Sequence, residues 1–239
     1  MDGVEIMNHG HLLDQFCSPL SNQLDGPYGN GSLEDRVRLT MDVLTAVRER
    51  VGDDFVLGIR MGADEAEAGG ITPDEGLKIA EHLKASGLLD YFNVNRGRIH
   101  TDPAMTDMIP VQGMPSAPHL NLAGSIRAAT GMPVFHAARI PDVATARYAV
   151  QSGQLDMVGM TRAHMADPMI VQKIIAGREE DIRPCVGATY CLDRIYGAGE
   201  ALCIHNAATG RELTMPHEIT PAEVAKKVVI IGAGPAGLE

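Results

Sequence analysis

Short apolar runs alternate with longer amphipathic stretches over most of the chain. The short runs predict five strands, over Val4–Met7, Phe55–Met61, Tyr91–Asn95, Pro133–His136 and Met157–Thr161. Between the runs, apolar residues recur at the three- and four-residue spacing of one helix face. These stretches predict helices over Ser32–Val51, Thr72–Ser86, Leu120–Thr130, Asp142–Ser152 and Asp167–Ala176.

Two segments lack this alternation. Arg96–Pro118 carries four prolines from Pro103 onward and is expected to be a long loop. From Gly177 to Lys227 the pattern predicts little regular structure, apart from a short helix around Leu192–Tyr196.

Residues at the predicted helix ends support the first two helices. Ser32 and Thr72 are suited to cap the helices that follow them, because their hydroxyls can accept a backbone N–H of the first turn. Pro73 fits the first position of the second helix, and Gly87 fits its end.

Repeated strand–helix units favour a parallel sheet, either doubly wound or closed as a (β/α)8 TIM barrel. Polar residues gather at the strand ends, which suits chemistry at the carboxyl face of a barrel. These residues are Asn8, His9, Arg60, Asn93, Asn95, His136, Thr161 and Arg162. With five strands, the α/β fold is expected to be the C-terminal part of a barrel, about strands 4–8.

Composition narrows the classes of partner. Of the 239 residues, 45% are hydrophobic, as in an ordinary globular core, and the net charge is −11. This negative charge argues against nucleic acid or an anionic membrane surface as partner, and leaves a small-molecule substrate. No apolar run approaches the roughly 20 residues of a membrane span. Few, clustered cysteines favour a reducing, cytoplasmic setting.

Two motifs near the end indicate redox chemistry. Cys185, Cys191 and Cys203 lie close together, as in an iron–sulfur or metal site. The apolar run Val228–Ile231, which we expect to form the first strand of a Rossmann-like domain, leads into Gly232-Ala-Gly-Pro-Ala-Gly237. In that loop Gly232, Gly234 and Gly237 match a dinucleotide-binding motif. The expected organisation is a partial barrel over 1–178, a cysteine segment over 179–215, and a linker with the start of a nucleotide-binding domain over 216–239. We expect that domain to be truncated here, so that this chain binds no nucleotide.

Ordered motifs along the chain resemble the Old Yellow Enzyme family, in its multidomain branch of amine dehydrogenases, N-methyl amino acid demethylases and 2,4-dienoyl-CoA reductase. The motifs are Asp2-Gly-Val-Glu-Ile6, Leu12-Leu-Asp-Gln-Phe16, Tyr28-Gly-Asn-Gly-Ser-Leu-Glu-Asp-Arg36, Gly58-Ile-Arg60, Gly159-Met-Thr-Arg162 with Ala166-Asp-Pro168, Ile182-Arg-Pro-Cys185 and Cys203-Ile-His-Asn206. The resemblance implies a flavin-bearing barrel, a 4Fe–4S segment and a module for FAD or NAD(P). Most of that last module would lie outside this chain.

The resemblance also implies roles for single residues. Arg60 would approach N1 and the C2 carbonyl of FMN, where a cation stabilises the reduced ring. Ala138, Arg139, Thr161 and Arg162 would cradle the FMN phosphate, although the family usually has glycine where Thr161 stands. His9 and His11 would face the substrate as catalytic residues. The segment is one residue shorter than the usual motif, so His9 takes the second donor position and the first partner is lost.

The cysteine pattern departs from the branch at one position. The usual spacing Cys-x2-Cys-x2-Cys-x11-Cys places Cys185, Ala188, Cys191 and Cys203 at the four ligand sites. The second ligand is therefore missing. Three thiolates could hold a 4Fe–4S cluster with an open iron or a three-iron cluster, with His205 as a candidate further ligand. Zinc bound by three cysteines and a histidine, or a degenerate segment without metal, remain alternatives.

Together these features predict part of an FMN- and iron–sulfur-dependent oxidoreductase that demethylates or dehydrogenates a small N-methylated amine. An NAD(P)H-dependent 2,4-dienoyl-CoA or enone reductase is the first alternative. A non-catalytic remnant, favoured by Ala188, is the second. A homo-oligomer or a separate electron-transfer partner is compatible with either enzymatic reading.

Overall fold

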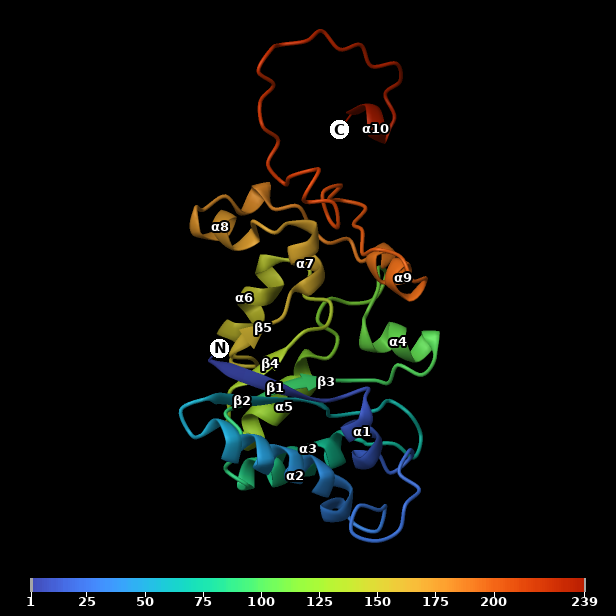
Figure 1. Ribbon diagram of the computed structural model, residues 1–239, viewed down its shortest axis with the longest axis vertical. Coiled ribbons are helices and arrows are strands. Elements are labelled where there is room, and N and C mark those ends of the chain that lie inside the picture. The colour runs from blue at the N-terminus through green and yellow to red at the C-terminus, as the bar shows by residue number, and fades with distance from the viewer. Residues whose placement is uncertain (1, 239) are drawn as a thin grey trace.

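One parallel sheet organises the computed structural model, which describes residues 2–238. Its strands are β1 (Gly3–Asn8), β2 (Val56–Gly62), β3 (Tyr91–Asn95), β4 (Val134–His136) and β5 (Met157–Val158). They pair in chain order, each parallel to the next. Every connection is therefore a crossover, and the larger ones carry helices on the face of the sheet (Figure 1). The predicted parallel α/β architecture is confirmed.

Helices fill the crossovers and continue beyond the sheet. They are α1 (Leu12–Cys17), α2 (Leu33–Val51), α3 (Pro73–Ala85), α4 (Asp102–Met108), α5 (Leu120–Thr130), α6 (Val143–Gln151), α7 (Thr161–Ala166), α8 (Ile170–Ile175), the 3-10 turn η1 (Glu179–Asp181), α9 (Tyr190–Tyr196) and α10 (Pro235–Leu238). Leu44, Ile79 and Ile126 of α2, α3 and α5 are buried against Ile59 and Phe92 of the sheet. Within residues 2–238, no helix has the length and apolar character needed to cross a membrane.

Capping residues start the helices where the sequence indicates. The Ser32 hydroxyl accepts the Asp35 N–H at 3.1 Å, and the Thr72 hydroxyl accepts the Glu75 N–H at 3.3 Å. Asp142 caps α6 in the same way, accepting the Thr145 N–H at 2.7 Å. Satisfying these otherwise unpaired donors sets the start of each helix.

The segment 96–118, predicted as a loop, contains α4. Thr101 caps this helix by accepting the Ala104 N–H at 3.3 Å, and Pro103 lies in its first turn. Proline is tolerated there because the N–H it lacks has no partner within the helix. Its presence was therefore a poor reason to predict a loop. Helix α1, in the segment after the first strand, was not predicted either.

The boundaries after β4 also differ from the prediction. β5 ends at Val158, and Thr161, predicted to end that strand, opens α7 instead. The single helix predicted over Asp167–Ala176 is divided, because Asp167 ends α7 and turns the chain. Its carboxylate accepts the Met169 N–H at 3.0 Å, the Arg183 N–H at 2.9 Å and the Lys173 ammonium at 2.5 Å.

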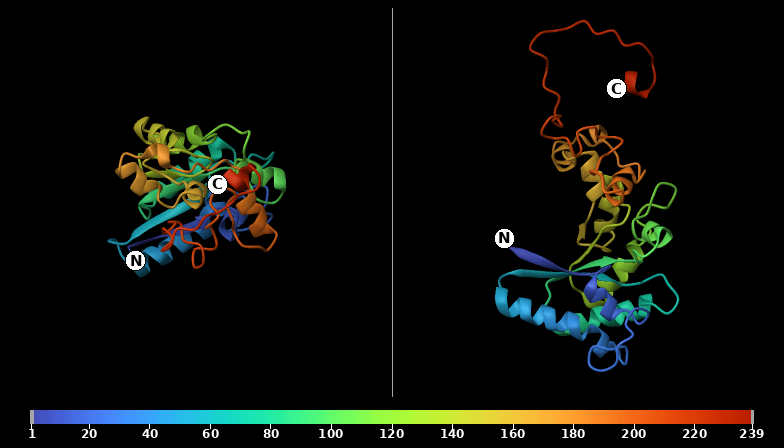
Figure 2. Two further views of the ribbon diagram at one scale, coloured as in Figure 1. Left: turned by 90° about the horizontal axis from the view of Figure 1, so that it is seen from above. Right: turned by 45° about the vertical axis from the view of Figure 1, so that its right-hand side comes forward.

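The end of the chain loops away from the sheet, beyond α8 and α9 (Figure 2). No strand forms over 228–231, against the prediction, and Val228, Val229 and Ile231 are exposed. An isolated strand gains no ladder hydrogen bonds, and no other described segment pairs with this one. The glycine loop does make a tight turn, since a side chain on Gly237 would lie 2.3 Å from the Gly232 carbonyl oxygen.

Two aspartates link neighbouring strands at their amino ends. Asp90 precedes β3 and accepts the Leu57 N–H of β2 at 2.7 Å and the Arg48 guanidinium at 2.8 Å. Asp156 precedes β5 and accepts the Val134 N–H of β4 at 2.9 Å and two bonds from Arg127. The same connection thus occurs twice, each time tying a helix to two strands. The Arg127 hydrogen bond lowers the pKa of Asp156 below its usual 3.8, although partial burial opposes the shift.

Replacing Asp156 with asparagine should lower stability at neutral pH by about 1 kcal/mol, the scale of one such hydrogen bond. Because the folded pKa lies below 3.8, the carboxylate stabilises the fold above that pH. Its contribution is lost as the pH falls through the folded pKa. Denaturant titrations from pH 7 to pH 3 measure the free energy of unfolding. This free energy should fall less steeply with decreasing pH for Asp156→Asn than for the wild type. The control is Asp53→Asn, at an exposed turn position. It should show the same pH dependence of the unfolding free energy as the wild type.

Candidate active site

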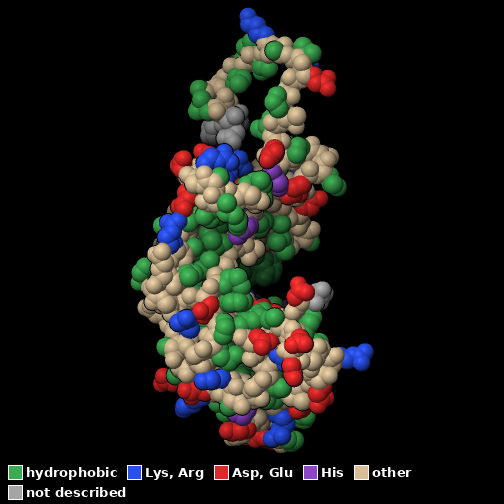
Figure 3. Space-filling view, turned by 90° about the vertical axis from the view of Figure 1, so that its left-hand side faces the viewer, with side chains coloured by type: hydrophobic (Ala, Val, Ile, Leu, Met, Phe, Trp, Pro, Cys, Tyr) green, Lys and Arg blue, Asp and Glu red, His purple; other side chains and the backbone are tan. Residues whose placement is uncertain are grey.

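A cavity of about 310 Å³ opens at the carboxyl ends of β2 to β5. The residues that line it include Arg60, Asn95, Ala138, Arg139, Thr161, Arg162, Cys185 and Cys191. Five of these are the residues predicted to bind FMN, so the structure brings all of them together. In the space-filling view, hydrophobic side chains gather where the surface is hollowed between the sheet and the segments that follow it (Figure 3).

Arg60 places a fixed cation at the end of β2. Its Nη1 donates to Asn93 Oδ1 on β3 at 3.2 Å, and Asn93 in turn donates to the Glu5 carboxylate of β1 at 3.0 Å. Burial lowers the pKa of Arg60, and the charge of Glu5 opposes that shift. An arginine remains charged at neutral pH despite such a shift, so this side chain can stabilise negative charge on a bound group.

Arg139 and Arg162 form the other end of the cavity. Arg139 has a left-handed backbone, with φ of 47°, and its Nε donates to the Met114 carbonyl at 2.9 Å. Strained backbone of this kind is concentrated at functional sites. Arg162 Nη2 donates to the Pro110 carbonyl at 2.9 Å, while its buried Nη1 has no partner among the described residues. A buried, unpaired guanidinium N–H beside a second arginine is suited to an oxyanion such as phosphate.

Asn95 is a site residue whose role the sequence left unassigned. Asn95 lines the cavity and is 2% exposed, and its Oδ1 has no hydrogen-bond partner in residues 2–238. His9 fixes this orientation: its Nε2 donates to the Gly97 carbonyl at 2.9 Å, so its Nδ1 must accept from Asn95 Nδ2 at 3.1 Å. The free amide oxygen can therefore accept an N–H of a bound ring. Its position at a strand end was the only signal in the sequence.

The two predicted substrate-facing histidines do not line the cavity. His9 is buried with both ring nitrogens bonded, and burial lowers its pKa, so it is neutral at physiological pH. His11 is exposed at the start of α1. Their catalytic assignment stays a prediction, and the contacts of His9 are those of a residue that positions Asn95.

Three cysteines surround a second hollow next to the first. Cys185, Cys191 and Cys203 line it together with Ala188 and His205. Among residues 2–238, no three His, Cys, Asp or Glu side chains lie close enough to hold a metal ion without adjustment. The fourth cysteine, Cys17, is buried under α2, where burial raises its pKa to about 11 and keeps the thiol protonated.

The two hollows share a wall. Arg162, Met165, Cys185, Gly187 and Cys191 line both of them. Gly187 permits this close approach, because a side chain there would lie 2.4 Å from the Arg139 guanidinium. A group held by the cysteines would therefore be adjacent to a group held by the arginines.

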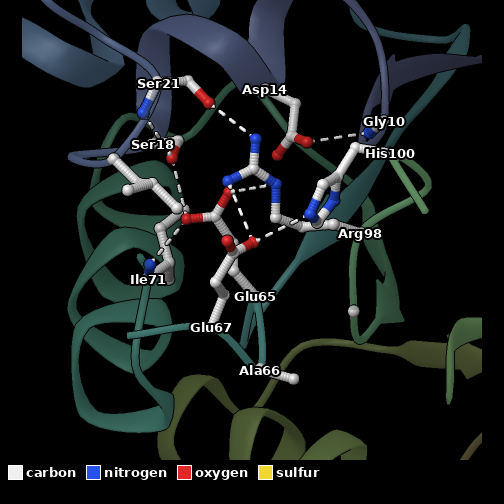
Figure 4. Close-up of polar contacts among 12 residues, drawn as sticks. Gly10, Asp14, Ser18, Ser21, Glu65, Ala66, Glu67, Ile71, Arg98 and His100 are labelled. Carbon is white, nitrogen blue, oxygen red and sulfur yellow. Dashed lines mark hydrogen bonds and ion pairs between the residues drawn. The ribbon is translucent and has the colours of Figure 1, made fainter. Parts of the chain in front are cut away.

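A polar network closes the loops after β2 and β3 (Figure 4). Arg98 donates to Ser21 Oγ at 2.9 Å and lies 3.6 Å from Glu65 Oε1 and 3.4 Å from Glu67. Glu65 is 4% exposed and also accepts the Ser18 hydroxyl at 2.8 Å and the Ile71 N–H at 2.7 Å. Because the buried carboxylate needs the arginine as partner, this network fixes the loops beside the cavity.

The family model for the NADH:flavin oxidoreductase / NADH oxidase family matches residues 1–181. The chain belongs to this family. The resemblance to Old Yellow Enzyme-like flavin oxidoreductases is thus confirmed, and membership supports FMN as a cofactor. Residues 182–239, with the cysteines and the glycine loop, lie outside that match.

Sequence similarity to curated relatives extends over the whole chain. It is 66% identical over 239 residues to a probable N-methylproline demethylase of Rhizobium meliloti (strain 1021), covering 100% of this chain and 35% of the relative. It is 44% identical over 242 residues to an N,N-dimethylglycine/sarcosine dehydrogenase of Chromohalobacter salexigens, again covering 100% and 35%. The chain spans about a third of the length of these flavin oxidoreductases.

A solved structure confirms the fold. A 2-naphthoyl-CoA reductase in complex with 2-naphthoyl-CoA superposes with a TM-score of 0.90 at 30% identity, covering 99% of this chain and 36% of the reductase. The five parallel strands therefore correspond to part of a larger barrel enzyme. The similarity extends beyond the barrel into the cysteine segment, since nearly the whole chain is covered.

Proposed function

We propose that the protein is an FMN- and iron–sulfur-dependent oxidoreductase that oxidatively demethylates a small N-methylated amine. The observation that carries this proposal is the wall shared by the arginine cavity and the cysteine hollow. Electron transfer between two redox groups needs a short separation, and the shared residues supply one. Cys185 and Cys191 contribute to both hollows.

The cavity residues would hold FMN along its length. Arg139 and Arg162, with Ala138 and Thr161, would bind the phosphate, and the unpaired Nη1 of Arg162 would gain an acceptor. At the other end, Arg60 would face the ring. Bound FMN would supply the acceptor for a hydride from the carbon next to the amine nitrogen. Arg60 stabilises the negative charge that the ring gains, and Asn95 Oδ1 can accept a ring N–H.

The cysteine hollow fits an iron–sulfur cluster by the chemistry of its donors. Three cysteine side chains line one concavity, and the Cys203 sulfur accepts the His205 N–H at 3.4 Å. Soft thiolate ligands select iron–sulfur clusters or zinc. The adjoining flavin cavity favours the redox-active group, because zinc carries no electrons.

The surroundings of His9 support an amine substrate over an enone. Reduction of an enone needs donors that polarise its carbonyl, and the only N–H of neutral His9 is already given to Gly97. The relatives whose names refer to N-methylproline, N,N-dimethylglycine and sarcosine favour an N-methylated amino acid. A 2,4-dienoyl-CoA reductase remains the rival enzyme.

The remaining proposals concern the rest of the protein. Gly232, Gly234 and Gly237 would open a module for FAD or NAD(P), which would exchange electrons with the cluster. We further propose a cytoplasmic enzyme, because partly exposed cysteine thiols stay reduced in a reducing compartment. A homo-oligomer or a separate electron-transfer partner fits the apolar side chains that remain exposed, such as Ile175 and Tyr196.

Anaerobic mixing of the full-length protein with substrate tests this function. N-methylproline, dimethylglycine or sarcosine should bleach the flavin absorbance within one turnover, with release of formaldehyde. Proline and glycine, which lack the methyl group, serve as matched controls and should leave the spectrum unchanged. Bleaching by NADH with turnover of an enoyl-CoA, and none by the methylated amines, would favour the reductase instead.

A further inference from the structure

Besides the three cysteines, a histidine lines the cysteine hollow and could replace the missing fourth cluster ligand. Ala188 has no donor atom in its side chain, yet it occupies the second position of the four-ligand pattern. His205 lines the same hollow as Ala188 and the three cysteines. The neighbouring hydroxyl of Thr189 is already used, since it donates to the Ala188 carbonyl at 2.7 Å. His205 therefore carries the best available donor.

The hydrogen bonds of His205 leave the correct ring nitrogen free. Its Nδ1 lies 2.8 Å from the Pro184 carbonyl oxygen, which can only accept, so Nδ1 is the donor and Nε2 is the ring nitrogen left for a metal ion. Histidines that bind metals are held in this way, with the other N–H given to a carbonyl or carboxylate. Because Pro184 directly precedes Cys185, the same bond anchors the imidazole beside the first cysteine.

The backbone around His205 is also fixed relative to the cysteines. The His205 N–H donates to Cys203 Sγ at 3.4 Å. Asn206, 2% exposed, donates to the Met165 carbonyl at 2.9 Å and attaches the segment to α7, which lines both hollows. The imidazole thus lies on a segment that is held beside the three cysteines of the hollow.

We propose that His205 Nε2 is the fourth ligand of the cluster, together with Cys185, Cys191 and Cys203. This inference rests on the proposed iron–sulfur cluster and specifies how it is held. A neutral imidazole replaces a thiolate, so the cluster carries one negative charge fewer than one bound by four cysteines. Its reduction potential should be higher for that reason, as it is where histidines replace cysteines in Rieske centres.

The test uses the full-length protein, purified anaerobically after labelling its histidines with ¹⁵N. Pulsed electron paramagnetic resonance of the reduced protein should detect a strongly coupled ¹⁵N nucleus. His205→Gln should abolish that coupling and either lose one iron for each flavin or lose the cluster altogether. Ala188→Cys combined with His205→Gln should restore the iron content and show a lower reduction potential than the wild type.

His164→Gln is the matched control. His164 is also exposed and has Nδ1 hydrogen-bonded to a carbonyl, that of Met160 at 3.0 Å, but it lines neither hollow. This variant should retain the ¹⁵N coupling and the iron. If the wild-type cluster shows no histidine coupling and His205→Gln leaves it unchanged, the assignment of His205 is wrong, but the proposed cluster is not affected. Wild-type protein without iron would overturn the cluster itself, and with it the proposed electron path.

Discussion

Replacing Gly76 with alanine should destabilise the protein by about 3 kcal/mol, the upper range for overpacking a rigid site. Gly76 lies in α3, and a side-chain carbon there would be 2.0 Å from the Ala63 carbonyl oxygen and 2.6 Å from its carbonyl carbon. These are backbone atoms, so no rotamer change relieves the clash. Ala63 is fully buried and donates its N–H to the Asn95 carbonyl at 2.9 Å. The strain would therefore reach the edge of the active-site cavity.

Gly124→Ala in α5 is the matched control for this prediction. Its nearest contact would be the flexible side chain of Gln154 at 3.2 Å, which can move aside. Alanine also favours a helix over glycine by up to about 1 kcal/mol, so this variant should be neutral or more stable. Denaturant midpoints of both variants and of the wild type measure the difference. Equal midpoints for the two variants would contradict the close packing of α3 against the end of β2.

Arg162→Ala should weaken FMN binding by about 100-fold, which corresponds to about 2.7 kcal/mol. Hydrogen bonds to charged groups contribute on this scale, and the phosphate would lose the guanidinium whose Nη1 has no other described partner. Arg162→Lys should recover part of the affinity, because lysine keeps the charge but not the planar fork. Titration of the flavin-free protein with FMN, followed by flavin fluorescence, gives the dissociation constants.

Arg178→Ala provides the control for loss of a positive charge. Arg178 is exposed and pairs with Asp181, outside both hollows. Its removal should leave FMN affinity within about twofold of the wild type, since exposed ion pairs contribute little. Equal affinities of Arg162→Ala and wild type would show that the phosphate is bound elsewhere.

Sequence pattern predicted the elements whose hydrophobic period is unambiguous. β3 and α5 have the predicted bounds, and α2 begins one residue after its predicted cap, Ser32. The family resemblance implied sites at Arg60, Arg139 and Arg162. Arg60 and Arg162 also stand at predicted strand ends, which meet on one face of a parallel sheet. The structure brings these three residues to a common cavity.

Other features depended on contacts that no local pattern records. The roles of His9 and Asn95 were not visible, because the bond between them joins residues far apart in the chain. α4 differs from the predicted loop because Pro103 lies in the first turn, where proline does not interrupt a helix. The network around Arg98 and Glu65 joins two loops that follow different strands. The sequence shows that both loops carry charged residues, but it does not show that these residues meet.

The central claim is that one protein holds FMN and an iron–sulfur cluster side by side, in the cavity of Arg60, Arg139 and Arg162 and in the adjoining cysteine hollow. The most direct measurement is the absorption spectrum of the full-length protein purified without oxygen, with iron, sulfide and flavin analysis of the same sample. We expect extractable FMN, together with iron and sulfide whose broad visible absorbance is bleached by dithionite. Protein that lacks either the flavin or the iron would contradict this claim.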